Sequence, residues 1–208
     1  MSQSRRARER EQRTNDIMNV ALKHFVAKGY ENASLDDMAA ELELSKPAIY
    51  RYFDSKEDLF NAVRVRGMYL RDTMITEAVA SGKTGLDKVY RIGVVYYEFW
   101  KLYPDHYRLH SISRGLARTN PESKNYQLIL DYRRRFLKVV CGAIEEGKND
   151  GSIRPDIDTL MTAVFARDAM MAVIEASDEY MRVMESSGRT RDEFVKHSMN
   201  LLLHSIKA

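Results

Sequence analysis

The sequence predicts an all-α fold, with an N-terminal three-helix domain over residues 10–70 and a C-terminal helical bundle over residues 71–208. Apolar residues recur at intervals of three and four along most of the chain, which is the period of one face of a helix. No stretch carries the apolar and polar alternation of a half-buried strand. Breaks such as Ser81-Gly82 and Ser187-Gly188 separate the helical stretches. The 208 residues, 44% of them hydrophobic, are enough for a sizeable core.

The first helix is expected over Thr14–Lys28. Its apolar stripe consists of four residues, Ile17, Val20, Ala21 and Phe25. Gly29 follows as a natural left-handed stop. Residues 2–13 are polar and contain five arginines. We expect them to form a helical extension that is frayed in the free protein.

Residues 34–56 are expected to form two short helices across a tight turn, followed by the start of a third helix. Ser34 can cap the first, and Asp37 lies at the capping-box spacing. Residues 41–44 form the predicted turn. Ser45 offers a second N-cap, and Pro47 lies in the first turn of the second helix, where a missing N–H costs little. Two apolar residues four apart define the buried side of this helix, Ile49 and Phe53.

The outward side of the second short helix has the chemistry of a DNA-reading surface. It carries a small residue among polar ones, namely Lys46, Ala48, Arg51 and Tyr52. Cations and hydroxyls reach phosphates and base edges, while a small side chain allows close approach in the major groove. A solvated face of any compact three-helix domain remains the alternative. The net charge is only +3, so the interpretation depends on where the charges lie rather than on their total.

Residues 10–70 resemble the DNA-binding domain of the TetR family of bacterial transcriptional regulators. The resemblance is carried by an ordered set of residues, Ile17, Ala21, Phe25, Gly29-Tyr30, Ser34, Met38-Ala39, Leu44-Ser45-Lys46-Pro47-Ala48-Ile49-Tyr50, Tyr52-Phe53, Ser55-Lys56-Glu57 and Leu59. One departure is Glu43, which stands in the helix-turn-helix turn where the family usually has Gly. A positive φ at this position would strain the Glu backbone.

The resemblance and the outward surface together predict the DNA-binding residues, Ser34, Ser45, Lys46, Pro47, Ala48, Tyr50, Arg51, Tyr52 and Lys56. Phosphate or sugar contacts are expected from the hydroxyls and ammonium groups among them, and Lys46 can also reach a base. By analogy with the family motif, Pro47, Ala48 and Arg51 are placed for base contact. The arginines of residues 2–13 form either the frayed extension or an arm that touches DNA when bound.

The remaining helices follow from the breaks between them. A helix of about 25 residues capped by Ser55 is expected to run as far as Ser81-Gly82, and by resemblance it is the family's connecting helix. Later helices are expected over a series of ranges, 85–102, 104–117, 122–149, 157–185 and 191–206.

The stretch from Tyr90 to Phe136 is rich in aromatic residues. Most aromatics at helical spacing belong to a core, but buried Tyr and Trp need polar partners and suit a cavity wall. The resemblance implies a small-molecule effector, for which the candidate lining is Tyr97, Trp100, His106, His110 and Tyr132. The two histidines are four apart, a spacing that can bind a metal. No matching third ligand is evident, so we expect neither a metal nor another cofactor.

The last two helices, about 157–185 and 191–206, are broadly apolar. They form either intramolecular core or, as the resemblance implies, a four-helix interface of a homodimer. Two reading helices about 34 Å apart would match a palindromic operator.

The expected function is therefore a homodimeric repressor that a small-molecule effector releases from its operator. A DNA-binding regulator without an effector, constitutive or controlled by a protein partner, is the alternative. An enzyme is not expected, because no phosphate loop, nucleophile elbow or HExxH motif is present. The lone Cys141, the lack of an 18-residue apolar run and the charged N-terminus predict a cytoplasmic protein without membrane spans.

Overall fold

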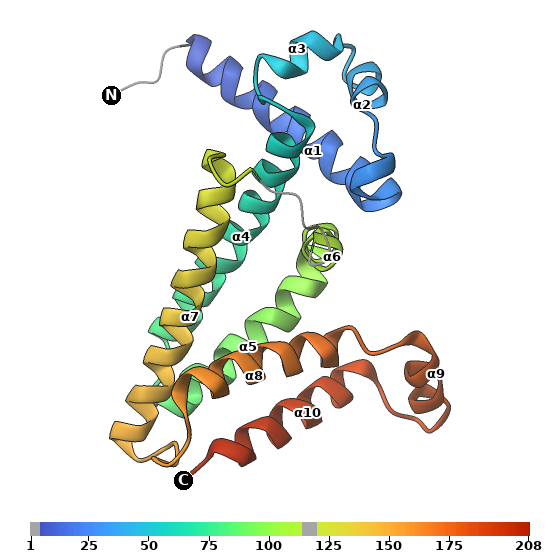
Figure 1. Cartoon of the computed structure of the whole chain (residues 1–208). Helices are drawn as coiled ribbons and strands as arrows, with labels where there is room; N and C mark the ends of the chain where they lie inside the picture. Colours follow the sequence, from blue (N-terminus) through green and yellow to red (C-terminus); the bar gives the residue numbers. More distant parts are fainter. Residues whose placement is uncertain (1–4, 114–119) are drawn as a thin grey trace. The chain divides into compact units, whose positions relative to one another are not determined.

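The computed structural model describes residues 5–113 and 120–208, which form the helices drawn in Figure 1. In chain order they are α1 (Arg5–Asn32), α2 (Leu35–Glu41), α3 (Lys46–Tyr50), α4 (Lys56–Ala80), α5 (Gly85–Leu102), α6 (Pro104–Ile112), α7 (Lys124–Asp150), α8 (Thr159–Ile174), α9 (Asp178–Ser186) and α10 (Arg191–Ile206). Within these residues there is no strand, only an isolated bridge between Ile153 and Lys207. The predicted all-α fold is confirmed. None of the described helices combines the length and apolarity needed to cross a membrane.

The contacts divide the chain into two compact units. The first contains the described residues up to Tyr69 and those between Tyr103 and Asp131, and the second contains Leu70–Leu102 and Tyr132–Ala208. The predicted domain division next to residue 70 lies at one of these boundaries. Residues 103–131 were placed in the C-terminal domain by the prediction, whereas their contacts group them with the N-terminal helices.

The core of the first unit surrounds Phe25 of α1. Its ring makes an edge contact with Phe60 of α4, with centroids 5.0 Å apart. The apolar sides of α2 and α3 close this core through Met38 and Ile49, both at most 1% exposed. Leu109 of α6 joins the same cluster. The short helices are therefore stabilised by a shared core rather than by their own length.

In the second unit, α5 packs against α8 and α10, and its first residue lies against α7. A Cβ on Gly85 would lie only 2.0 Å from the backbone nitrogen of Gly147, so this position requires glycine. The Gly85 N–H donates to the Asp150 carboxylate at 2.7 Å. The start of α5 is thus held directly on the backbone of α7.

The predicted single helix over 157–185 is wrong. Its residues form α8 and α9, which are separated at residues 175–177. Ser177 has an extended backbone and its side chain accepts a hydrogen bond from the Tyr180 N–H, so it caps a new helix. Asp178 and Glu179 then occupy the first turn of α9, where negative charge is favourable.

The ends of α1 and α6 add detail to the predicted ranges. Helix α1 begins at Arg5, so the expected helical extension before Thr14 is helical from that residue onward. Gly29 interrupts α1 with φ 72° and ψ 170°, a positive φ but not a left-handed helical residue. Helix α6 ends at Ile112, and most of the remainder of its predicted range lies at 114–119, outside the described residues.

Candidate nucleic-acid interface

The turn between α2 and α3 is a Schellman motif with a glutamate at its left-handed position. The Leu44 N–H donates to the Ala39 carbonyl at 2.8 Å, and the Glu43 N–H donates to the Ala40 carbonyl at 3.1 Å. Glu43 has φ 54° and is the only non-glycine with positive φ in the described residues. The turn therefore has the geometry that normally favours glycine, and a side chain there carries strain.

Two serines begin the short helices, but their hydroxyls have different uses. The Ser34 Oγ accepts hydrogen bonds from the N–H groups of Asp36 and Asp37, at 3.2 and 3.4 Å. The Ser45 side chain makes no such bond, although its backbone is extended as expected of an N-cap. Ser45 is exposed, and its hydroxyl is not used in capping.

Helix α3 turns Ile49 inward and presents its polar side to solvent. Tyr50 is 44% exposed, and Pro47 and Arg51 are also exposed. Four other predicted contact residues are partly buried, namely Ser34, Lys46, Ala48 and Tyr52. Apart from the buried Ile49, the residues from Lys46 to Arg51 are therefore at least partly accessible to solvent.

Lys46 is held by a neighbour on α2. Its ammonium lies 2.9 Å from an Asp36 carboxylate oxygen, and this hydrogen bond raises the pKa of Lys46. Both groups are substantially exposed, so the pair contributes little to folding. A DNA phosphate would compete with Asp36 for the same ammonium group.

Arg10 of α1 joins this surface, and it was not among the predicted contact residues. Its guanidinium lies 5.1 Å from the centroid of the Tyr52 ring, and it donates to the Arg51 carbonyl at 3.4 Å. The sequence left residues 2–13 as either a frayed helical extension or an arm that touches DNA, and it did not indicate which arginine meets the end of α3. The hydrogen bond joins residues 41 positions apart in the chain. Helical periodicity relates only residues a few positions apart, so it could not have predicted this contact.

Lys56 lies at the start of α4 and contacts the end of α1. Its ammonium donates to the Glu31 carbonyl at 3.1 Å and lies 4.8 Å from the Tyr30 ring centroid. Burial lowers its pKa from the ordinary value. An ammonium has three donors, so one bond to a carbonyl leaves two for a phosphate.

Two polar side-chain contacts connect α1 to α2. Lys28 lies 2.6 Å from the Asp37 carboxylate, and His24 lies 2.8 Å from Glu41. The hydrogen bond and charge of Lys28 lower the pKa of the Asp37 carboxyl. Both contacts link the surfaces of α1 and α2, while the buried Met38 anchors α2 in the core.

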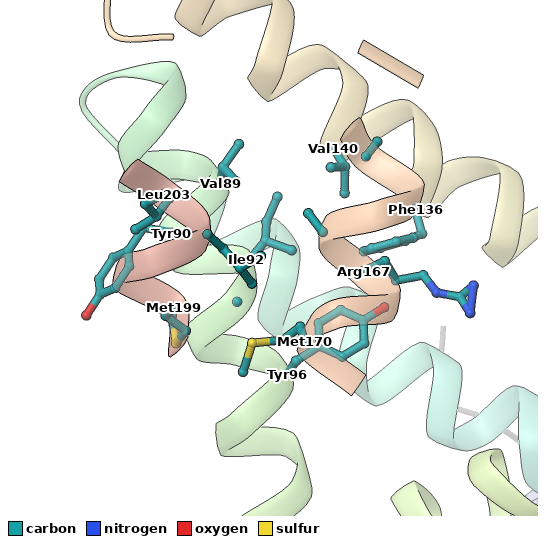
Figure 2. A pocket seen from close by; sticks show the side chains of 14 residues that line it. Val89, Tyr90, Ile92, Tyr96, Phe136, Val140, Arg167, Met170, Met199 and Leu203 are labelled. Carbon is teal, nitrogen blue, oxygen red and sulfur yellow. The ribbon is translucent and has the colours of Figure 1, made fainter. Parts of the chain in front are cut away.

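The second unit contains an apolar cavity of about 60 Å³ between α5, α7, α8 and α10 (Figure 2). Its walls are aliphatic, aromatic and methionine side chains with one charged residue, and comprise Val89, Tyr90, Ile92, Gly93, Tyr96, Phe136, Val140, Ala163, Ala166, Arg167, Met170, Met199, Leu202 and Leu203. In Figure 2 the guanidinium of Arg167 and the hydroxyl of Tyr90 point away from the apolar side chains that face one another. The cavity is smaller than the 300–1,000 Å³ typical of ligand pockets.

None of the five predicted effector residues lines this cavity. Tyr97 and Trp100 instead stack at the far end of α5, with centroids 5.5 Å apart and planes 10° apart. The Tyr97 hydroxyl donates to Asp192 of α10 at 2.5 Å, and the Arg191 guanidinium lies 5.4 Å from the Trp100 ring. Burial and the bond to Asp192 raise the pKa of Tyr97. These contacts tie α5 to the start of α10.

The other three predicted effector residues lie elsewhere. His106 and His110 are on α6 in the first unit, and Tyr132 is on α7 in the second. His106 packs against Gly67, and burial, with the positive charge of Arg66, lowers the pKa of the imidazole to about 4. The described residues contain no cluster of three or more metal-binding side chains.

Large apolar side chains are exposed on α8 and α10. Met161 is 74% exposed and Phe165 is 61% exposed, while Leu160, Val164 and Leu201 are between 40% and 60% exposed. Ala163 and Met170 lie on the buried side of α8. The helix thus has apolar residues on both sides, which is unusual for one that faces only water.

Comparisons with known proteins give a consistent family assignment. Residues 17–63 match the family model of bacterial regulatory proteins of the tetR family. The HTH-type transcriptional repressor KstR2 of Rhodococcus jostii (strain RHA1) is 23% identical over 164 residues, which is 78% of each chain.

Solved structures show the same fold along nearly the whole chain. A tetR-family regulatory protein from Rhodococcus RHA1 has a TM-score of 0.75 and 23% identity, covering 94% of this chain and 97% of its own. The structure of AibR in complex with isovaleryl coenzyme A and operator DNA has a TM-score of 0.72 and 17% identity, covering 92% and 98%. These findings show that the chain carries a DNA-binding domain of the tetR family of bacterial regulatory proteins and has the fold of that family's regulators along nearly its whole length.

Proposed function

We propose that this regulator is a homodimeric repressor that binds a palindromic operator in the cytoplasm and is released by a small apolar effector. The observation that carries the DNA-binding part is the exposed polar side of α3, held by the buried Ile49 and by the turn at Glu43. KstR2 of Rhodococcus jostii, which resembles this chain over most of its length, is named a repressor. This supports repression as the sign of regulation.

In the proposed complex α3 enters the major groove. Pro47, Ala48 and Arg51 face base edges, where Arg can bind guanine through two hydrogen bonds. Phosphates and sugars are contacted by residues around them, namely Ser45, Lys46, Tyr50, Tyr52 and Lys56. Ser34 acts indirectly, because its Oγ is occupied in capping α2.

The proposed dimer uses the exposed apolar sides of α8 and α10. Met161, Phe165 and Leu201 are each at least 60% exposed, and burying them would remove considerable apolar area from water. Two copies of each helix would form a four-helix interface around a two-fold axis. This arrangement pairs two α3 helices for the two halves of a palindrome.

The proposed effector site is the apolar cavity of the second unit. AibR was solved with isovaleryl coenzyme A, so a ligand with an acyl chain is a reasonable first class to test. The cavity volume of about 60 Å³ means that α5, α7, α8 and α10 must separate to admit such a chain. Because that separation costs free energy, the ligand would favour a second conformation. A differential affinity of about 1–3 kcal/mol would change DNA affinity about 5–150-fold.

The small volume also favours the alternative, a regulator that works without an effector. The effector contacts predicted from the sequence for Tyr97, Trp100, His106, His110 and Tyr132 stay predictions, because none of these residues lines the cavity. Thermal-shift measurements with isovaleryl-, octanoyl- and stearoyl-coenzyme A would separate the two hypotheses. A flat response alongside tight DNA binding would favour the alternative.

The DNA-binding proposal is tested by selecting sequences from a random DNA library and titrating them by fluorescence anisotropy at fixed salt. We expect a palindromic sequence bound by one dimer, at least 1,000-fold more tightly than a scrambled control. Selected sequences that bind no better than the scrambled control would refute the proposal.

A further inference from the structure

The carboxylate of Asp58, in the first turn of α4, joins two separate segments of the first unit. Its Oδ2 accepts a hydrogen bond from the Asp54 N–H at 3.2 Å. Its Oδ1 accepts one from the Asn125 side-chain amide at 2.9 Å and one from the Ser123 hydroxyl at 3.4 Å. One oxygen therefore contacts the loop after α3, and the other contacts the start of α7.

Helix capping accounts for only one of these oxygens. Ser55 is the cap of α4, and its Oγ accepts from the Asp58 N–H at 3.0 Å. The return bond from Asp58 to Asp54 completes a local arrangement like a capping box. Asn125 and Ser123 are more than 60 residues away in sequence, and capping does not require them.

The loop held by Oδ2 is continuous with the reading helix. The N–H groups of Tyr52 and Phe53 both donate to the Ile49 carbonyl, at 2.9 and 3.2 Å. Phe53 is 5% exposed in the core of the first unit, and Asp54 follows it directly. Fixing the Asp54 backbone therefore fixes the C-terminal end of α3.

The segment held by Oδ1 belongs to a helix that also reaches the cavity. Asn125 is the second residue of α7, and the same helix supplies Phe136 and Val140 to the cavity wall. A second bond supports the junction, because the Asn120 N–H donates to the Glu57 carboxylate at 2.7 Å. The start of α7 is thus bound to the first turn of α4 by two neighbouring carboxylates.

We propose that Asp58 is a positioning residue for operator recognition, through which the first turn of α7 sets the orientation of α3. The inference rests on the proposed function. Hydrogen bonds to a carboxylate are stronger than neutral ones and directional, so they can hold a loop in one geometry. A displacement of the α7 start by about 1 Å would take the Asn125 bond out of hydrogen-bond range and release one side of this carboxylate.

The test compares Asp58→Asn, Asn125→Ala and the double variant in anisotropy titrations with the selected operator and with scrambled DNA. Asn125→Ala leaves the Ser55 cap, the Asp54 bond and the Ser123 hydroxyl in place, so it removes only the side-chain amide bond between α7 and Asp58. Each single variant should lose about 5–10-fold in operator affinity, with scrambled-DNA affinity within about twofold of wild type. The double variant should bind no more weakly than the weaker single variant, because both changes break one link.

Asn19→Ala is the matched control. It removes a side-chain hydrogen bond of similar length, from Arg66 to Asn19 at 2.8 Å, in the same unit but away from the loop after α3. We expect a Tm loss comparable to that of Asn125→Ala, measured by circular dichroism, with unchanged operator affinity.

Wild-type operator affinity in Asn125→Ala would overturn the inference, as would an equal loss on scrambled DNA or an equal operator loss in Asn19→Ala. In each of these cases the wild-type protein still binds its operator, and the proposed function stands. Absence of any preferred operator for the wild-type protein would overturn the proposed function, and this inference with it.

Discussion

Replacing Glu43 with glycine should stabilise the protein. Glu43 has φ 54° at the left-handed position of the Schellman motif between α2 and α3. A Cβ in this conformation costs about 1–2 kcal/mol, which glycine removes. Glycine also gains about 0.5–1 kcal/mol of freedom in the unfolded chain, which opposes the effect. The expected net gain in unfolding free energy for Glu43→Gly is about 0.5–1 kcal/mol.

Glu43→Ala is the control that isolates the backbone effect. It removes the same charge from an exposed position but keeps the Cβ and its strain. The alanine variant should therefore stay within about 0.5 kcal/mol of wild type. A difference between the glycine and alanine variants reports the conformational strain alone.

The assay is urea unfolding followed by circular dichroism at 222 nm, at one fixed protein concentration because a dimer's stability depends on concentration. Glu43→Gly should shift the midpoint to higher urea with an unchanged slope, and raise Tm by about 2 °C. A glycine variant no more stable than the alanine variant would refute the argument that this turn is strained.

Three further predictions concern the Lys46–Asp36 ion pair, the exposed apolar side of α8 and the buried imidazole of His106. Lys46→Ala should weaken operator binding more than tenfold and reduce the salt slope by about one, whereas Asp36→Asn, which frees the ammonium, should strengthen binding. The measurement is an anisotropy titration at several salt concentrations between about 50 and 200 mM. If both variants bind like the wild type, Lys46 does not contact a phosphate. Phe165→Glu should give monomers in analytical ultracentrifugation and lose operator binding without loss of helix content, and a persistent dimer would contradict the proposed interface. His106 has a folded pKa of about 4, below its unfolded value of 6.5, so the unfolded chain takes up the proton first as the pH falls. The unfolding free energy should therefore decline between pH 6.5 and 4, by at most about 3 kcal/mol. The decline should be smaller in His106→Gln. An equal decline in this variant would show that another group is responsible.

Local chemistry in the sequence was sufficient to predict most helix boundaries. Gly85–Leu102 and Arg191–Ile206 form α5 and α10 with the predicted ends, because their caps and breaks lie within a few residues of each end. The strain at Glu43 was predictable for the same reason, since a turn of this kind requires a particular backbone conformation at one position. The break at Ser177 was missed although its capping residue and acidic first turn are present in the sequence.

The contacts at the C-terminal end of α3 were not predictable in this way. Arg10 meets Tyr52, and Asp58 meets Asn125, across 41 or more residues of chain. The sequence also placed Tyr97 and Trp100 among effector candidates, whereas the structure stacks them beside the start of α10.

Residue patterns predicted the all-α fold, the order of most helices and the family resemblance of the DNA-binding domain, because periodicity, caps and turn residues act over one or two helical turns. Three features depend on the packed structure, namely which arginine contacts the end of α3, which residues line the cavity and which carboxylate connects the loop after α3 to α7. Those outcomes depend on how helix sides pack in three dimensions, and a side chain's partner there is chosen by distance in space rather than by position in the chain.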